Sequence, residues 1–147
     1  MEFITKSSSE TKKLGKTFAA KLAGGDILAL SGDLGSGKTT FVQGFARGLG
    51  IKARIISPTF ILMRKYNIKL EESKAQKLKN FYHIDLYRLE ENIEREVVNL
   101  GLTEIWDWKE NIIIIEWAEK IRGLIPKKAQ WITFENLGGD RRKVVFE

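Results

Sequence analysis

The segment Gly32-Asp33-Leu34-Gly35-Ser36-Gly37-Lys38-Thr39-Thr40 restricts the fold of this chain more than any other part of the sequence. It matches the P-loop pattern G-x-x-x-x-G-K-[ST] in full. Its glycines let the backbone curl, so that successive amide N–H groups point into one concavity that can hold phosphate oxygens. The ammonium group of Lys38 adds a positive charge for the outer phosphates, and the hydroxyl of Thr39 is suited to coordinate Mg²⁺. The residues expected to bind a nucleotide here are Gly35, Ser36, Gly37, Lys38, Thr39 and Thr40.

The segments on either side of this loop are those that a P-loop requires. Residues 26–31 form a short apolar run that predicts a buried strand, and residues 38–49 carry apolar side chains at helical spacing. The helix is expected to begin at about Gly37 and to end near Gly48 and Gly50. Its N-terminus adds partial positive charge and unpaired N–H groups, which favour an anionic ligand.

Length and composition bound the class of protein. A chain of 147 residues, of which 43% are hydrophobic and 30% charged, predicts a single globular P-loop NTPase domain over residues 1–147. No apolar run approaches the roughly 20 residues needed to span a bilayer. The first residues lack the apolar core of a signal peptide, and there is no cysteine. We therefore expect a cytoplasmic protein that does not contact membranes.

The net charge of +6 leaves two interpretations open. A basic balance is typical of proteins that bind nucleic acid or another anionic partner. Much of the charge lies in residues 69–79, which contain both lysines and glutamates, and such a mixture of signs also suits an ordinary solvated surface.

Apolar periodicity predicts an α/β fold. The isoleucines at 112–115 suit a central strand that is covered on both faces. The last two strands are expected to form an antiparallel hairpin around Gly138 and Gly139. The expected architecture is a three-layer αβα sandwich with a mostly parallel central sheet. Strands are predicted at 3–4, 26–31, 51–56, 60–66, 80–88, 111–117, 130–134 and 143–146, and helices at 8–22, 38–49, 90–100 and 119–124.

Two predicted strands end in acidic residues, Asp85 and Glu116. Ligands of open α/β sheets bind at the carboxyl edge of the strands, where the P-loop also lies. Because Mg²⁺ prefers oxygen ligands, both carboxylates are candidates to hold it together with Thr39. Glu116 is also a candidate to orient a hydrolytic water. The alternative for each residue is an ordinary surface acid at a strand end.

For several other polar and aromatic residues, the sequence does not distinguish a role in the site from a structural role. Thr59 follows the stiff Ser57-Pro58 bend, where it is either part of a plain turn or a switch residue that senses the γ-phosphate. His83, the only histidine, is more typical of a hydrogen-bonded structural residue than of a catalyst. Trp117 is expected in the core rather than stacked on a base. The guanine-reading pattern Asn-Lys-x-Asp is absent, which favours ATP over GTP.

Four motifs together resemble the bacterial TsaE family, a group of small P-loop ATPases of tRNA threonylcarbamoyladenosine biosynthesis. They are the P-loop with Phe41, Ser57-Pro58-Thr59-Phe60, His83-Ile84-Asp85-Leu86-Tyr87-Arg88-Leu89 and Ile115-Glu116-Trp117. A Thr-x-x-Leu-Gly opening also stands at 11–15. The chain departs from the family in its longer Lys-rich segment at 69–79 and in Ser36, where the family usually has alanine.

The resemblance implies an activity and its partners. Family members bind ATP and Mg²⁺, hydrolyse ATP weakly alone, and act with the threonylcarbamoyl transferase TsaD and its paralogue TsaB. Hydrolysis is thought to reset the complex that modifies the adenosine next to the anticodon, so contact with tRNA is expected to be indirect. By the same resemblance, Thr39 and Glu116 are Mg²⁺ ligands, Asp85 is the Walker B acid, Lys38 holds phosphates, Thr59 is the switch residue and Thr11 lies near the nucleotide.

Two other functions suit a small P-loop protein. One is a small-molecule or nucleoside kinase, although such kinases usually have an arginine-rich lid, and Arg122, Arg141 and Arg142 stand in no clear lid. The other is a binding module that responds to nucleotide without hydrolysing it.

Overall fold

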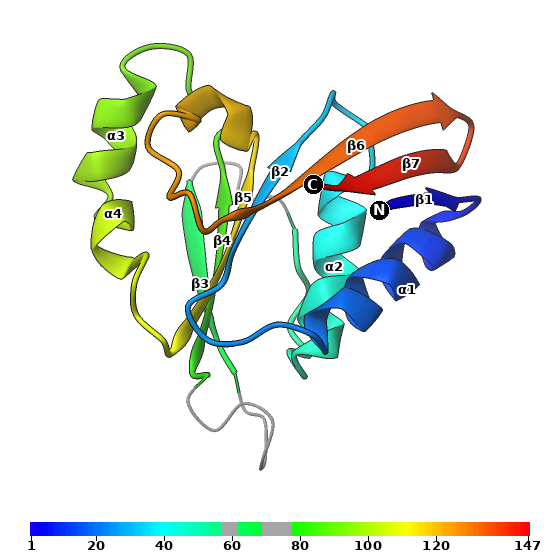
Figure 1. Ribbon diagram of the computed structural model, residues 1–147, viewed down its shortest axis with the longest axis horizontal. Coiled ribbons are helices and arrows are strands. Elements are labelled where there is room, and N and C mark those ends of the chain that lie inside the picture. The colour runs from blue at the N-terminus through cyan, green and yellow to red at the C-terminus, as the bar shows by residue number, and fades with distance from the viewer. Residues whose placement is uncertain (57–61, 69–77) are drawn as a thin grey trace.

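A central β-sheet organises the computed structural model, which describes residues 1–56, 62–68 and 78–147 (Figure 1). Within these residues the sheet has seven strands in the order β1-β7-β6-β2-β5-β4-β3. The strands are β1 (Glu2–Thr5), β2 (Ile27–Ser31), β3 (Met63–Asn67), β4 (Asn80–Asp85), β5 (Asn111–Glu116), β6 (Gln130–Gly138) and β7 (Arg141–Phe146).

The middle of the sheet is parallel and its margins are antiparallel. Strand β2 pairs in parallel with β5 and β6, and β5 pairs in parallel with β4. Strands β3, β7 and β1 pair antiparallel with their neighbours, so β6 and β7 form the expected hairpin. The predicted central strand is confirmed, because β5 lies between β2 and β4 with all its residues buried.

Helices cover both faces of the sheet, which confirms the three-layer prediction (Figure 1). Helices α1 (Ser8–Ala19) and α2 (Lys38–Gly48) lie on one face. Helices α3 (Ile93–Asn99) and α4 (Leu102–Ile105), with the 3₁₀ helix η1 (Ala118–Ile121), cover the other. No helix in the described part of the chain is long and apolar enough to cross a bilayer.

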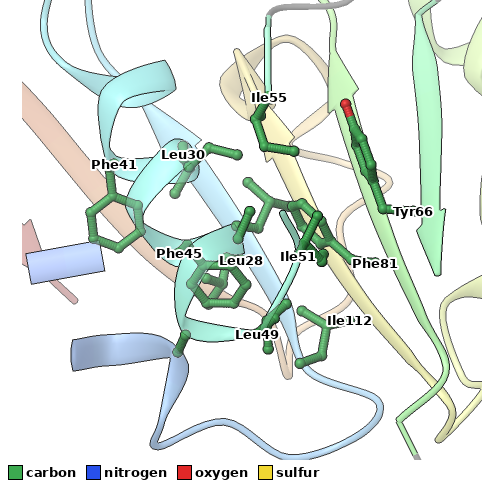
Figure 2. Packing of buried hydrophobic residues seen from close by; sticks show 14 of the residues in the cluster. Leu28, Leu30, Phe41, Phe45, Leu49, Ile51, Ile55, Tyr66, Phe81 and Ile112 are labelled. Atoms are coloured by element: carbon green, nitrogen blue, oxygen red, sulfur yellow. The ribbon is translucent and has the colours of Figure 1, made fainter. Parts of the chain in front are cut away.

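Alternate residues of the central strands supply two separate cores. Leu28 and Leu30 of β2 pack with Phe41 and Phe45 of α2, as Figure 2 shows, and Ile112 lies in the same cluster. The intervening strand residues, such as Ile113 and Ile115, pack against the helices of the opposite face. This alternation also fixes the direction in which the last residue of each strand points.

Some predicted elements differ from the observed ones. Residues 51–56 form no strand, although Ile51 and Ile55 are buried, because the segment fills the core as a loop. Helix α1 begins after Ser7, whose Oγ accepts a hydrogen bond from the Glu10 amide at 3.1 Å. Helix α1 ends at Ala19, and the predicted helices at 90–100 and 119–124 shorten to α3 and η1. Of the predicted strand at 60–66, residues 63–66 belong to β3, residue 62 precedes that strand in a bend, and residues 57–61 lie outside the described residues.

Helices α1 and α2 touch through their backbones. A Cβ atom added to Gly44 would stand 1.9 Å from the carbonyl oxygen of Lys12, and one added to Gly15 would stand 2.2 Å from that of Phe41. Glycine at these positions therefore holds the N-terminal half of α1, with Thr11, close to the P-loop helix.

Replacing Gly44 with alanine is expected to destabilise the fold by about 1–3 kcal/mol, because the two helices must separate to admit the methyl group. Chemical denaturation measures the loss. Gly123→Ala is the matched control, since an added Cβ there meets nothing within 4 Å. Equal stability of the two variants would show that α1 and α2 do not depend on this contact.

Candidate nucleotide-binding site

The loop between β2 and α2 has the backbone conformation of a phosphate cradle. Gly35 and Gly37 have φ angles of 77° and 103°, which side chains with a Cβ rarely adopt. Gly37 is the N-cap of α2 and makes no side-chain cap hydrogen bond. A Cβ at Gly35 would meet nothing within 4 Å, so the space beside this residue is open. The loop therefore suits an anion at a helix N-terminus.

A cavity of about 420 Å³ opens beside this loop. Every residue of the described chain that the sequence marked as a site candidate lines it, from Thr11 of α1 through the P-loop to Asp85 and Glu116. Thr59 lies outside the described residues. The lining also includes Ser8, Leu34, Tyr87, Arg88, Trp117, Asp140 and Arg142.

Strand register explains why the two acids meet. Asp85 is paired with Glu116 at the carboxyl ends of the parallel strands β4 and β5. Phe81 and Ile114 contribute to the core under α2, so Asp85 and Glu116, an even number of residues farther along, point to the same face. Glu116 Oε1 accepts a hydrogen bond from Thr39 Oγ1 at 2.8 Å, and Asp85 Oδ1 accepts one from the Tyr87 amide at 3.0 Å.

The donor atoms at this edge fit a hard divalent cation. Thr39, Asp85 and Glu116 offer hydroxyl and carboxylate oxygens, which suit Mg²⁺. The described residues contain no group of three or more His, Cys, Asp or Glu arranged to enclose a metal. A cation here would therefore complete its coordination with phosphate and water oxygens, as Mg²⁺ commonly does beside a nucleotide.

Lys38 lies inside the cradle. Its Nζ donates to the carbonyl oxygen of Gly32 and, at 3.0 Å, to that of Asp33. The same atom stands 4.0 Å from the centroid of the Trp117 ring. Burial lowers the pKa of the Lys38 ammonium, and the negative charge of Glu116 is the main opposing influence. A second anionic group, such as a phosphate, would favour the charged form further.

Trp117 contacts both the hydrophobic core and the cavity, two positions that the sequence analysis had treated as alternatives. Its ring packs against the second core, as expected, but it also lines the cavity beside Lys38. Its φ of 61° places a bulky residue in the left-handed region directly after Glu116. Such backbone strain occurs frequently at functional sites.

Two contributors to the site were missed by sequence reasoning. His83 is fully buried, and its Nε2 lies 2.6 Å from Glu116 Oε2, so the expected hydrogen-bonded histidine has a site acid as its partner. Its spacing of two residues from Asp85 could have indicated the shared face. Arg142 of β7 lies beside the P-loop, 3.3 Å from where a Gly37 Cβ would stand. No local sequence pattern predicts the contact between Arg142 and the P-loop, because it depends on where the β6–β7 hairpin lies in the sheet.

Comparison with known proteins shows likeness over nearly the whole chain. A family model described as Threonylcarbamoyl adenosine biosynthesis protein TsaE matches residues 5–144. The tRNA threonylcarbamoyladenosine biosynthesis protein TsaE of Bacillus subtilis (strain 168) is 37% identical over 146 residues, which cover 99% of this chain and 84% of that protein. The protein of the same name from Treponema pallidum (strain Nichols) is 31% identical over 144 residues, 98% of each chain. The crystal structure of Bacillus subtilis YdiB matches with a TM-score of 0.76 and 35% identity, covering 99% of this chain and 83% of that one.

Proposed function

The chain belongs to the TsaE family, and we propose that it binds ATP and Mg²⁺ in the cavity beside the P-loop and hydrolyses the terminal phosphate. One observation supports this most directly: the oxygens of Thr39, Asp85 and Glu116 gather beside an open glycine-rich loop. Relatives named for tRNA threonylcarbamoyladenosine biosynthesis place the family in that process. The reaction proposed for this chain is ATP hydrolysis that supports turnover of the modification machinery.

Each group at the site has a proposed task. The amides of residues 35–39 and the ammonium of Lys38 would hold the phosphates, and Thr11, which lines the same cavity, would lie near the nucleotide. Thr39 and Glu116 would ligate Mg²⁺, with Asp85 beside them. Bound Mg²⁺ would neutralise charge on the phosphate oxygens. Glu116 has a carboxylate suited to orient the attacking water. Thr59 keeps its proposed role as the switch residue.

The proposed partners are the transferase TsaD and its paralogue TsaB, with tRNA reached through the complex and all of it in the cytoplasm. Mixing the chain with both proteins, with and without ATP, tests this by gel filtration. Co-elution that depends on nucleotide would support the assignment. Independent elution under ATP would leave ATP binding intact but remove the proposed partners. Turnover stimulated by a small-molecule acceptor instead would indicate a kinase.

Arg142→Ala is expected to weaken ATP binding by about 10- to 150-fold, because a charge-assisted hydrogen bond contributes about 1.5–3 kcal/mol. The guanidinium already donates to Asn136 Oδ1 at 3.1 Å and to the Gly139 carbonyl at 2.7 Å, which holds it at the cavity wall. Isothermal titration with ATP and Mg²⁺ gives the affinity. Arg122→Ala is the control, since Arg122 stacks on Trp131 outside the cavity lining. Unchanged affinity in Arg142→Ala would exclude Arg142 from nucleotide binding.

A further inference from the structure

A buried histidine holds one of the two site acids. His83 has an exposed fraction of 0% and Glu116 one of 2%, and their facing atoms, Nε2 and Oε2, lie 2.6 Å apart. We propose that His83 is a positioning residue, which fixes the carboxylate of Glu116 so that its other oxygen faces Thr39 and the cation site. This inference rests on the proposed function, since Glu116 matters through the nucleotide and its metal.

The two oxygens of Glu116 have different partners. Oε1 accepts from the hydroxyl of Thr39 at 2.8 Å, and Oε2 faces the imidazole of His83. A carboxylate held at both oxygens cannot rotate about its terminal bond without breaking a buried hydrogen bond, which is costly because the freed polar group is left without a partner. The pair therefore presents one defined oxygen toward the P-loop helix.

The imidazole is itself fixed in place. His83 lies within β4, in register with Ile114 of β5 and Arg64 of β3, so its backbone is held by a strand on each side. Its ring is nearly parallel to that of Phe81, with an interplanar angle of 7° and a centroid distance of 6.3 Å. Because strand and ring are both held, His83 can transmit a fixed orientation to Glu116.

The hydrogen-bond pattern predicts one tautomer. A carboxylate oxygen accepts, so Nε2 of His83 carries the hydrogen that it donates to Glu116. Nδ1 is buried and has no hydrogen-bond partner among the described residues. In the neutral ring with Nε2–H, that nitrogen is only an acceptor, and no buried donor is left unsatisfied. A purely space-filling histidine would have no reason to prefer this tautomer.

Two substitutions separate positioning from packing. His83→Phe keeps a flat ring beside Phe81 but removes the donor, whereas His83→Gln keeps an N–H donor near the place of Nε2. Hydrogen-bond partners of metal-ligating groups typically contribute 10–100-fold to metal affinity. His83→Phe is therefore expected to reduce by at least about tenfold the gain in nucleotide affinity that Mg²⁺ produces. His83→Gln is expected to retain most of that gain.

The test uses titration of a fluorescent ATP analogue into the full chain in EDTA and again in Mg²⁺. For His83→Phe we expect an unchanged dissociation constant in EDTA and a weaker one in Mg²⁺. An undiminished Mg²⁺ effect in His83→Phe would overturn the inference. Equal losses in His83→Gln and His83→Phe would also overturn it, because the donated hydrogen bond would then not be the cause.

A spectroscopic test does not depend on nucleotide. His83 is the only histidine, so ¹⁵N labelling of histidine gives a single imidazole to observe by NMR. We expect the hydrogen on Nε2 in the wild type and a clear change of that signal in Glu116→Gln. A hydrogen on Nδ1 would overturn the inference. If the wild type failed to bind nucleotide, the proposed function would fall, while the NMR result would still decide whether His83 donates to Glu116.

Discussion

Lys38→Ala is expected to weaken ATP binding by about 2–5 kcal/mol, or roughly thirtyfold to several thousandfold, because it leaves the phosphates without their buried charge partner. The ammonium already lies within the cradle, held by the carbonyl oxygens of Gly32 and Asp33. Only 4% of the Lys38 side chain is exposed, so water does not replace the lost charge. Isothermal titration with ATP and Mg²⁺ measures the effect.

The same substitution should not unfold the protein. Burial lowers the pKa of Lys38 in the folded chain, so between that pKa and the ordinary lysine value the unfolded chain binds more protons. The contribution of Lys38 to stability therefore rises with pH in that alkaline window and is smallest where the ammonium is charged. We expect Lys38→Ala to remain folded at pH 7 and to show a flatter alkaline stability profile in chemical denaturation.

A matched lysine variant makes the affinity result specific. Lys16→Ala removes the same charge from an exposed position of α1 that does not line the cavity. Of the two lysine variants, only Lys16→Ala is expected to bind ATP with wild-type affinity. If Lys38→Ala bound ATP as tightly as Lys16→Ala does, the P-loop would not be the phosphate site.

Much of the fold could be predicted from short sequence patterns, because these patterns determine the local backbone conformation. The P-loop predicted a strand, a tight turn and a helix, and these are β2, the Gly32–Gly37 loop and α2. The isoleucines of β5 predicted a strand buried on both faces. The strand predicted at residues 51–56 was wrong because it also rested on an apolar pattern. Ile51 and Ile55 are buried, and buried residues give such a pattern whether or not the backbone joins a sheet.

The site was predictable only in part. The position of Asp85 and Glu116 at the ends of predicted parallel strands indicated from sequence alone that they lie near the P-loop, and both line the cavity. The pairing of His83 with Glu116 needed the register between β4 and β5, which depends on long-range packing. Arg142 reaches the P-loop because the β6–β7 hairpin pairs with β2, a contact across more than a hundred residues. Sequence spacing carries no signal for such a contact.

Glu116→Ala is expected to lower the rate of ATP hydrolysis by about 10²–10⁴-fold, the usual contribution of a positioned general base. The carboxylate lies at the end of β5, where Thr39 and His83 both donate toward it. Alanine removes the acceptor shared by these two groups and leaves no oxygen to orient water. The P-loop amides and Lys38 remain, so ATP should still bind in the absence of metal.

Steady-state phosphate release, measured with the proposed partners present, checks this expectation against Glu135→Ala. Glu135 is an exposed carboxylate of β6 whose ion pair with Lys143 lies outside the cavity lining, so its loss should leave turnover unchanged. ATP binding in EDTA separates a loss of chemistry from a loss of the site. Because the acid is buried and hydrogen-bonded at both oxygens, no neighbouring carboxylate can take the same position. Normal turnover in Glu116→Ala would therefore remove Glu116 from the reaction and leave Asp85 as the acid to examine.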